Sequence, residues 1–389
     1  KSGSLRLKSS YIRMIFSQKE VDEVQPKPNI VHLPVYQPGK PIEEVKRELG
    51  LSEVIKLASN ENPFGCSPKV REALMAEYEN LNIYPDGASQ ELAAALAHHL
   101  GVDPKQIIFG AGSDEVILMI ARAYLVKGDE TVMASPTFSQ YKHNAEIEGA
   151  VCIEVPLRDG KHDLPAMLAK VNERTKIVWV CNPNNPTGTI VTRQELTDFL
   201  DRVPPHVMVV LDEAYAEYIT SAEYPNGLEL IKTYPNLVVL RTFSKIYGLA
   251  SLRIGYGVGS SDVIRTINQV RGPFNTSRFA QAAAKAALQD QAFISYCREQ
   301  NAQGIAYLTG EFRRLGLSYY PAYGNFIMVD VKRPAQPVFE ALLRKGVIVR
   351  GGHALGFPTK IRVTVGRKEQ NEKFVRALEQ VLEEIAVHT

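Results

Sequence analysis

Short β-branched runs alternate with longer amphipathic stretches from about residue 100 onward. We predict strands at seven of these runs, residues 106–109, 131–134, 151–155, 176–181, 207–211, 237–240 and 254–258. Nearly continuous apolar strands that alternate with segments of helix length are typical of crossover connections in a mainly parallel sheet. The pattern therefore predicts an α/β fold in which helices cover both faces of the sheet.

Two of the amphipathic stretches carry specific helix signals. Residues 114–126 place Val116, Ile117, Ile120 and Tyr124 at the spacing of one helix face. A second helix should begin at Thr192, because Thr192 and Glu195 have the spacing of a capping box. Both helices would lie between predicted strands, as crossover connections require.

The C-terminal part of the chain has a different pattern. After a polar stretch at residues 271–275 come a long alanine-rich helix, strands at 326–330, 347–350 and 361–365, and a last helix from residue 370. Together with residues from about 35 to 62, these segments predict a smaller α+β domain. We therefore expect a large domain over residues 63–270 and a small domain made of 31–62 and 271–389.

Length and composition limit the class of protein. A chain of 389 residues exceeds what one hydrophobic core usually organises. The formal charge of +2 comes from 45 basic and 43 acidic residues without long blocks of one sign, which argues against nucleic acid as a partner. No apolar run is long enough to cross a bilayer, so a cytoplasmic protein without membrane contact is expected.

The four cysteines lie far apart in the sequence, at Cys66, Cys152, Cys181 and Cys297. No Cys-x-x-Cys pair and no neighbouring histidine has the spacing of metal ligands. We therefore predict neither a metal site nor a disulfide framework, and a reducing compartment fits best.

The first sixteen residues are basic and rich in serine and contain no acid, which is the composition of a transit peptide. A simpler interpretation is that Met14 is a natural start and that the preceding residues remain from cloning. Residues 1–30 are expected to be an N-terminal extension, disordered or left from cloning, that contributes nothing to the fold.

Candidate chemistry follows the predicted strands, where ligands of open α/β sheets bind. After the strand at 106–109 comes Gly110-Ala-Gly-Ser-Asp114, whose glycines allow close backbone approach and whose helix start suits a phosphate. Ser113 is expected to cap that helix. The segment is a weak motif by itself, because many helices begin this way.

A second candidate follows the strand at 176–181. The turn from Asn182 to Gly188 contains two prolines and a glycine, which would fix Asn185 as a hydrogen-bond donor.

A third candidate is Asp212, at the end of an apolar strand. A buried carboxylate there is costly unless it is paired, and a protonated pyridine nitrogen would be a suitable partner. The structural alternative for Asp212 is a helix N-cap.

The fourth candidate is the segment around Lys245, which follows the strand at 237–240. A lysine that forms a Schiff base needs a fixed position beside an anion-binding group. Ser244 and Arg253 lie close to it in sequence and would hold the phosphate of pyridoxal phosphate. Surface lysines near turns are common, so this segment gains weight only from its agreement with the others.

Together these segments resemble the pyridoxal-phosphate-dependent aminotransferases of fold type I, most closely the histidinol-phosphate aminotransferases. The resemblance runs from about Tyr36 to the last helix. It rests on LASNENP at 57–63, YPDG at 84–87, CNPNNPTG at 181–188, LDEAY at 211–215, TFSK at 242–245 and IRVTVG at 361–366.

The resemblance implies a role for each matching residue. Lys245 would hold pyridoxal phosphate as a Schiff base, Asp212 would keep the ring nitrogen protonated, and Tyr215 and Asn185 would bind the phenolic oxygen. Phe138 would stack on the ring. The phosphate would be held by Gly112, Ser113, Asp114, Ser244 and Arg253. A tyrosine like Tyr84 reaches the phosphate site of a neighbouring subunit in this family, which implies a homodimer with shared active sites.

The implied reaction moves an amino group between L-histidinol phosphate and 2-oxoglutarate, in histidine biosynthesis. Arg362, with Arg350, would receive carboxylate or phosphate groups, and Tyr36 and Asn325 are further candidates for the substrate pocket. Phe274 stands where some family members carry a tyrosine for the substrate phosphate. Because phenylalanine cannot donate that hydrogen bond, an aminotransferase for phenylalanine and tyrosine, or one with both activities, stays open.

Two more distant alternatives remain. A decarboxylase acting on phosphorylated amino acids would use the same fold, and a binding or regulatory module would keep the fold without the reaction. The joint presence of Lys245, Asp212 and Arg253 disfavours the second.

Overall fold

The computed structural model describes residues 24–36 and 39–387, the last of these by its backbone only. Of these, residues 24–36 belong to one unit and residues 39–387 to a second. Most of the predicted N-terminal extension, residues 1–23, lies outside the described residues. All helices and strands described below belong to the second unit.

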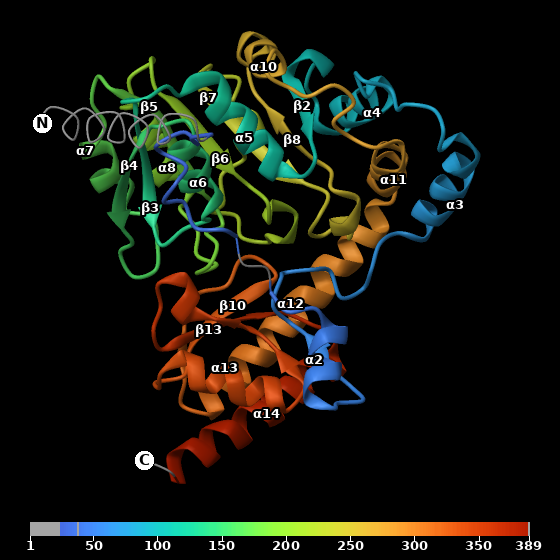
Figure 1. Cartoon of the computed structure of the whole chain (residues 1–389), viewed down its shortest axis with the longest axis vertical. Helices are drawn as coiled ribbons and strands as arrows, with labels where there is room; N and C mark the ends of the chain where they lie inside the picture. Colours follow the sequence, from blue (N-terminus) through green and yellow to red (C-terminus); the bar gives the residue numbers. More distant parts are fainter. Residues whose placement is uncertain (1–23, 37–38, 388–389) are drawn as a thin grey trace, which may run out of the picture. The chain divides into compact units, whose positions relative to one another are not determined.

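A seven-stranded sheet forms the core of the second unit (Figure 1). Its order is β2-β8-β7-β6-β5-β3-β4. The strands are β2 (Ile107–Gly110), β3 (Glu130–Ser135), β4 (Val151–Pro156), β5 (Thr175–Cys181), β6 (Met208–Asp212), β7 (Leu237–Thr242) and β8 (Gly255–Val258). All pairs are parallel except those of β8, which is antiparallel to β2 and β7. The seven predicted strands and the mainly parallel sheet are confirmed.

Helices cover both faces of this sheet, as predicted. One face packs on α5 (Ser113–Tyr124), α6 (Gln140–Ile147) and α10 (Ser261–Asn268). The other face packs on α3 (Pro68–Glu77), α4 (Gln90–Leu100), α7 (Leu164–Ala169), α8 (Arg193–Leu200), α9 (Gly227–Leu230) and α11 (Arg278–Leu288). The capping box predicted at Thr192 is present, since Thr192 and Glu195 each bond the other's backbone N–H.

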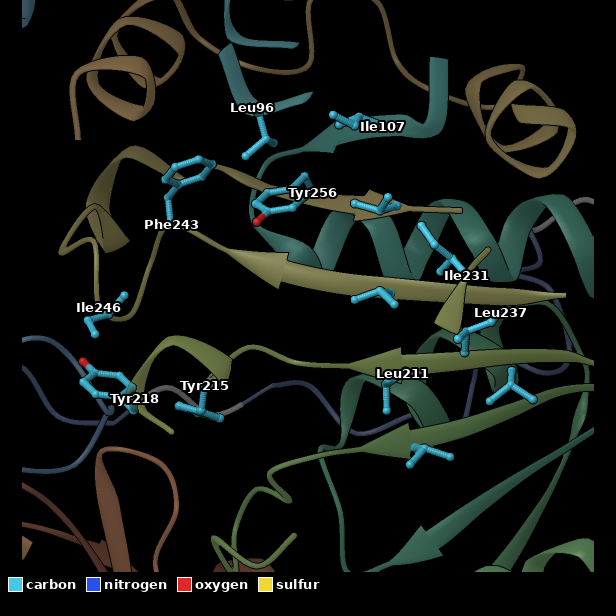
Figure 2. Close-up of a cluster of buried hydrophobic side chains, with 14 of the residues drawn as sticks. Leu96, Ile107, Leu211, Tyr215, Tyr218, Ile231, Leu237, Phe243, Ile246 and Tyr256 are labelled. Atoms are coloured by element: carbon cyan, nitrogen blue, oxygen red, sulfur yellow. The ribbon is translucent and has the colours of Figure 1, made fainter. Parts of the chain in front are cut away.

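Side chains of the strands alternate between these two hydrophobic clusters, as the pleat requires. Figure 2 shows the cluster that contains Leu96 of α4, Leu211 of β6 and Leu237 of β7. In the same view Tyr215 and Ile246 lie beyond the arrowheads of the strands. The apolar core therefore extends to the carboxyl edge of the sheet, where the predicted chemistry lies.

A smaller sheet follows along the chain, with the order β12-β13-β10-β9 and antiparallel pairing throughout. Its strands are β9 (Ser318–Tyr319), β10 (Phe326–Asp330), β12 (Arg350–Gly351) and β13 (Lys360–Thr364). It packs with α13 (Ala335–Arg344) and α14 (Lys368–Val387) in a separate hydrophobic cluster.

Helix α12 (Gln291–Arg314) belongs to both clusters. Ile294 and Cys297 in its first half pack with the large sheet, and Leu308 and Phe312 in its second half pack with the small one. Figure 1 shows α12 passing from the neighbourhood of α11 to that of β10 and β13. These clusters support the proposal of a large and a small domain, whose boundaries remain a prediction.

A segment near the start of the second unit joins the C-terminal part, as expected. It contains α2 (Ile42–Leu49) and β1 (Ile55–Lys56), and β1 pairs in parallel with β11 (Val347–Ile348). The strand predicted at residues 347–350 is therefore divided, because Val347 and Ile348 pair with β1 whereas Arg350 pairs with β13. Short 3-10 helices complete the described elements: η1 (Tyr78–Asn80), η2 (Pro104–Gln106), η3 (Ala216–Tyr218), η4 (Ala250–Leu252) and η5 (Gly352–Leu355).

Candidate active site

The candidate residues meet at the carboxyl edge of the large sheet. Cys181, which ends β5, lies in register beside Asp212, which ends β6, and Asp212 lies beside Leu240 of β7. The loops that follow β5, β6 and β7 therefore leave the sheet side by side. They carry Asn185, Tyr215 and Lys245, which the sequence spreads over 61 positions.

Asp212 is almost fully buried and makes two hydrogen bonds. Its Oδ2 accepts from the hydroxyl of Tyr141 at 2.6 Å and its Oδ1 accepts from the backbone N–H of Ala214 at 3.2 Å. Burial raises the pKa of the Asp212 carboxyl to about 6, although the bond from Tyr141 opposes the shift. Asp212 caps no helix, because η3 has Tyr215 at its N-cap.

Tyr141 is a site residue that the sequence did not reveal. It lies in α6, is fully buried and stacks on Trp179 with ring centroids 5.0 Å apart. Burial raises the pKa of the Tyr141 hydroxyl well above its usual value, so the hydroxyl keeps its proton and donates a hydrogen bond to Asp212. Phe138 lies edge-on to Tyr141 at 5.6 Å, which places the predicted stacking residue beside the partner of Asp212.

Lys245 is held inside the site. Its Nζ donates to the backbone oxygen of Ser59 at 3.3 Å and lies 5.7 Å from the ring centroid of Tyr215. Burial lowers the pKa of the Lys245 amine to about 8, and the positive charge of Arg362 acts in the same direction. A larger fraction of the amine is therefore uncharged and nucleophilic near neutral pH than in an exposed lysine.

Arg362 connects the small sheet to the turn after β5. Its Nη1 donates to Oδ1 of Asn185 at 2.6 Å and its Nη2 donates to the backbone oxygen of Ala58 at 2.7 Å. Arg350 lies directly opposite Arg362 in the antiparallel pair of β12 and β13, so both side chains share a face. The two predicted substrate arginines are therefore neighbours.

An anion cradle lies at the N-terminus of α5. Arg253 donates from Nη1 to Ser244 Oγ at 3.3 Å and from Nη2 to Asp114 Oδ2 at 3.2 Å. A Cβ on Gly112 would lie 2.4 Å from Arg253 Nη2, and Gly112 has a φ of 79°. Only glycine fits there, and the free N–H groups of the first turn of α5 complete a site suited to phosphate.

The predicted capping role of Ser113 is wrong. The helix begins at Ser113 itself, Gly112 occupies the N-cap, and no side chain caps it. Glu115 instead accepts the backbone N–H of Ala111 at 2.6 Å, which stabilises the preceding turn. The first turn of α5 therefore has no side-chain cap among the described residues, and its N–H groups are those that an anion would use.

The remaining predicted residues have distinct environments. The Nδ2 of Asn325 donates to Asn60 O at 2.9 Å and to the hydroxyl of Tyr218 at 3.3 Å. Its Oδ1 is buried and has no hydrogen-bond partner among the described residues, as expected of a group that faces a ligand. Tyr36 belongs to the first unit, and its role in the substrate pocket remains a prediction.

Tyr84 and Phe274 form a stacked pair with centroids 4.7 Å apart. Tyr84 is 75% exposed and Phe274 is 46% exposed. The Tyr84 carbonyl accepts from Arg278 Nη2 at 2.8 Å, so the exposed ring projects from an anchored backbone.

In the ranges 24–36 and 39–387, no three His, Cys, Asp or Glu side chains cluster closely enough to hold a metal ion. Over the same ranges, no helix has both the length and the apolar character needed to cross a membrane.

Comparison with known proteins identifies a family and several relatives that are aminotransferases. Residues 52–378 match the family described as aminotransferase class I and II. The chain is 57% identical over 359 residues to the histidinol-phosphate aminotransferase of Brevibacillus brevis, covering 92% of this chain and 99% of that protein. It is 55% identical over 357 residues to the enzyme of the same name from Bacillus subtilis, covering 92% and 99%.

The fold is also similar to solved structures. One is the crystal structure of a histidinol-phosphate aminotransferase from Sinorhizobium meliloti in complex with pyridoxal-5'-phosphate. It superimposes with a TM-score of 0.86 at 28% identity, covering 94% of this chain and 100% of that one.

Proposed function

The chain belongs to the class I and II aminotransferases, and within them to the histidinol-phosphate aminotransferases, and from this premise we propose its reaction. It moves an amino group from L-histidinol phosphate to 2-oxoglutarate, giving imidazole acetol phosphate and L-glutamate. The reaction is a step of histidine biosynthesis. The observation that carries the proposal is the convergence of Lys245, Asp212 and the Arg253 cradle on one edge of the sheet.

Pyridoxal phosphate fits this donor set, as three observations indicate. The cradle of Arg253, Ser244 and the first turn of α5 suits a phosphate, and a side chain on Gly112 would fill it. The buried carboxylate of Asp212 needs a cationic partner, which a protonated ring nitrogen would provide. Lys245 offers an amine with a lowered pKa. Asn185 and Tyr215 would bind the phenolic oxygen, and Phe138 would stack on the ring.

The bound cofactor supplies an electron sink for the pair released from the substrate Cα–H bond. The chain provides the proton transfers and the electrostatics. The amine of Lys245 would accept the proton from the substrate Cα and return it to the aldehyde carbon of the cofactor. The carboxylate of Asp212 holds a proton at the ring nitrogen, and Tyr141 keeps that carboxylate in place. Loss of the Asp212 charge should raise the barrier by several kcal/mol, in the range of about 3–4 kcal/mol for a lost electrostatic group.

Substrate recognition would use Arg362 and Arg350. Guanidinium groups match carboxylate and phosphate in a planar, two-pronged geometry, so one pair of arginines can serve both half-reactions. Asn325 Oδ1, which has no hydrogen-bond partner in the described part of the chain, would accept a hydrogen bond from substrate. This dual use accounts for two substrates of different shape in one pocket.

The active enzyme is proposed to be a homodimer with shared sites. Large apolar side chains are exposed close together in sequence around α3 and η1, namely Met75, Tyr78, Leu81, Ile83 and Tyr84. Exposed apolar groups of this size, gathered in one segment, are typical of a protein interface. A second copy of the chain would cover them, and Tyr84 would reach the phosphate cradle of that copy.

We place the reaction in the cytoplasm. The four cysteines are all free in the structure, which suits a reducing compartment.

Transamination of phenylalanine and tyrosine is the second candidate. It is favoured by Phe274, whose ring stacks on Tyr84 and offers no hydroxyl to a substrate phosphate. An aromatic substrate would lose less from that change than a phosphorylated one.

A steady-state assay distinguishes the two. Purified protein loaded with pyridoxal phosphate is supplied with histidinol phosphate or phenylalanine, each with 2-oxoglutarate, and glutamate formation is measured. We expect kcat/KM to be at least about tenfold higher for histidinol phosphate, equivalent to about 1.4 kcal/mol. A tenfold preference for phenylalanine would overturn the substrate assignment. Carbon dioxide release without keto-acid formation would indicate a decarboxylase instead.

A further inference from the structure

Asn60 joins three separate segments of the chain inside the candidate site. It is 1% exposed and has a φ of 57°, a left-handed conformation that asparagine tolerates better than most residues. Its side-chain Nδ2 donates to the hydroxyl of Tyr215 at 3.0 Å. Its backbone oxygen accepts from Asn325 at 2.9 Å, and its backbone N–H and side-chain Oδ1 both bond Thr364. Every polar group of this residue is therefore engaged.

The bonds to Thr364 set the orientation of the Asn60 amide. The Thr364 oxygen accepts the backbone N–H of Asn60 at 2.9 Å, and its single hydrogen is donated to Asn60 Oδ1 at 3.1 Å. In this arrangement Oδ1 faces Thr364 and the NH2 group of the amide faces Tyr215. The amide is thus assigned by its hydrogen-bond network.

This orientation determines what the Tyr215 hydroxyl can do. A phenol has one hydrogen to donate, and Tyr215 uses an oxygen lone pair to accept from Asn60. Its hydrogen is consequently directed elsewhere, and the Tyr215 ring lies 5.7 Å from the amine of Lys245. The hydroxyl is left as a donor for a ligand in that space.

We propose that Asn60 is a positioning residue, held by Thr364, that directs the hydroxyl hydrogen of Tyr215 toward the phenolic oxygen of bound pyridoxal phosphate. The inference rests on the proposed function, since it needs the cofactor in the site. A hydrogen bond donated to the phenolic oxygen stabilises its ionised form. Asn60 would therefore lower the pH at which the bound cofactor changes its absorbance, without touching the cofactor itself.

The central test replaces Asn60 by aspartate. Asn60→Asp keeps the size of the side chain and an oxygen for Thr364, but a carboxylate can only accept from Tyr215. The Tyr215 hydrogen would turn to residue 60 and leave the cofactor. We expect the absorbance titration of the loaded enzyme to shift upward by about one pH unit, and the same shift is expected for Tyr215→Phe. The value of kcat should fall, whereas KM should change less.

A double variant separates this effect from the added charge. In a Tyr215→Phe background, Asn60→Asp should cause no further shift, because the hydroxyl through which residue 60 acts is gone. An equal shift in both backgrounds would mean a direct effect of charge and would overturn the proposal. An unchanged titration in Asn60→Asp alone would also overturn it.

Thr364→Val is an uncharged second variant that keeps the proposal testable if Asn60→Asp does not fold. It removes the hydroxyl that orients the amide and nearly preserves the shape of the side chain. We therefore expect a smaller upward shift of the absorbance titration. An unshifted titration would contradict the role proposed for Asn60 and Thr364. Thermal unfolding of the cofactor-free proteins reports folding separately. If the unaltered protein binds no pyridoxal phosphate, the proposed function itself fails, and this inference with it. If that protein titrates and the variants match it, only the inference fails.

Discussion

At the scale of single residues, the site contains a buried carboxyl, Asp212, and a partly buried amine, Lys245, whose pKa values are shifted in opposite directions. Burial raises the pKa of Asp212 to about 6 and lowers that of Lys245 to about 8. Both shifts disfavour the charged form, so each group needs a ligand of complementary chemistry. A cationic ring nitrogen beside Asp212 and a carbonyl carbon beside Lys245 meet these needs. Groups shifted in this way are typical of functional sites.

The raised pKa of Asp212 predicts a pH dependence of stability in the cofactor-free protein. Between the usual value of 3.8 and about 6, the folded state binds more protons than the unfolded state. The contribution of Asp212 is present in full below this window and is lost as pH rises through 6, by about 3 kcal/mol. Asp212→Asn can still accept from Tyr141 but does not titrate. Its free energy of unfolding in urea should therefore fall less between pH 4 and pH 7.

The exposed variant Asp198→Asn serves as a control for the change of a carboxylate to an amide, and it should follow the unaltered protein across the series. Parallel curves of unfolding free energy against pH for the unaltered protein and Asp212→Asn would contradict the raised pKa of Asp212.

At the scale of elements, the phosphate cradle depends on how α5 begins. Gly112→Ala would place a methyl group 2.4 Å from Arg253 Nη2 at a backbone φ of 79°. We expect the dissociation constant of pyridoxal phosphate to rise at least about tenfold, since both the guanidinium and the turn must move. The measurement is a fluorescence titration of the cofactor-free protein.

Gly128→Ala is the matched control. Gly128 also has a positive φ, of 92°, but apart from Gly128 and its two chain neighbours no described atom lies within 4 Å of the position that an added methyl group would take. It should lose about 1 kcal/mol of stability while its cofactor affinity is unchanged. Equal affinity in both variants would show that the cradle does not hold the phosphate.

Elements were largely predictable from local pattern, whereas their partners were not. The seven strands of the large sheet are confirmed because each is a nearly continuous apolar run. The run at 347–350 looks like one strand but is divided, since Val347 pairs with β1 and Arg350 with β13. Strand pairing depends on segments distant in sequence, and local hydropathy does not contain that information.

The same reason explains which site residues were missed. Tyr141 and Asn60 contact Asp212 and Tyr215 from positions 71 and 155 residues away. Both lie in segments that the sequence singled out for other residues, Phe138 in one case and the 57–63 motif in the other. Their role follows only from the folded chain, because it consists of one hydrogen bond to a residue that carries the chemistry.

At the scale of the whole molecule, shared active sites make a prediction about mixed dimers. Lys245→Ala subunits should be inactive, and Tyr84→Ala subunits should need more pyridoxal phosphate. A dimer with one subunit of each kind has one site with both residues intact. Coexpression should therefore restore activity at limiting cofactor above that of either variant alone.

The control is coexpression of Lys245→Ala with Lys245→Ala carrying a second tag, which should recover nothing. A monomeric protein in sedimentation, or no recovery in the mixed dimers, would contradict the shared site.

The central claim is that Lys245 is the residue to which pyridoxal phosphate becomes attached. Borohydride reduction of the loaded protein, followed by digestion and mass spectrometry, tests this directly. The peptide containing residue 245 should carry the cofactor mass, and the Lys245→Ala protein should carry it nowhere. Attachment at another lysine, with residue 245 unmodified, would show that Lys245 does not hold the cofactor.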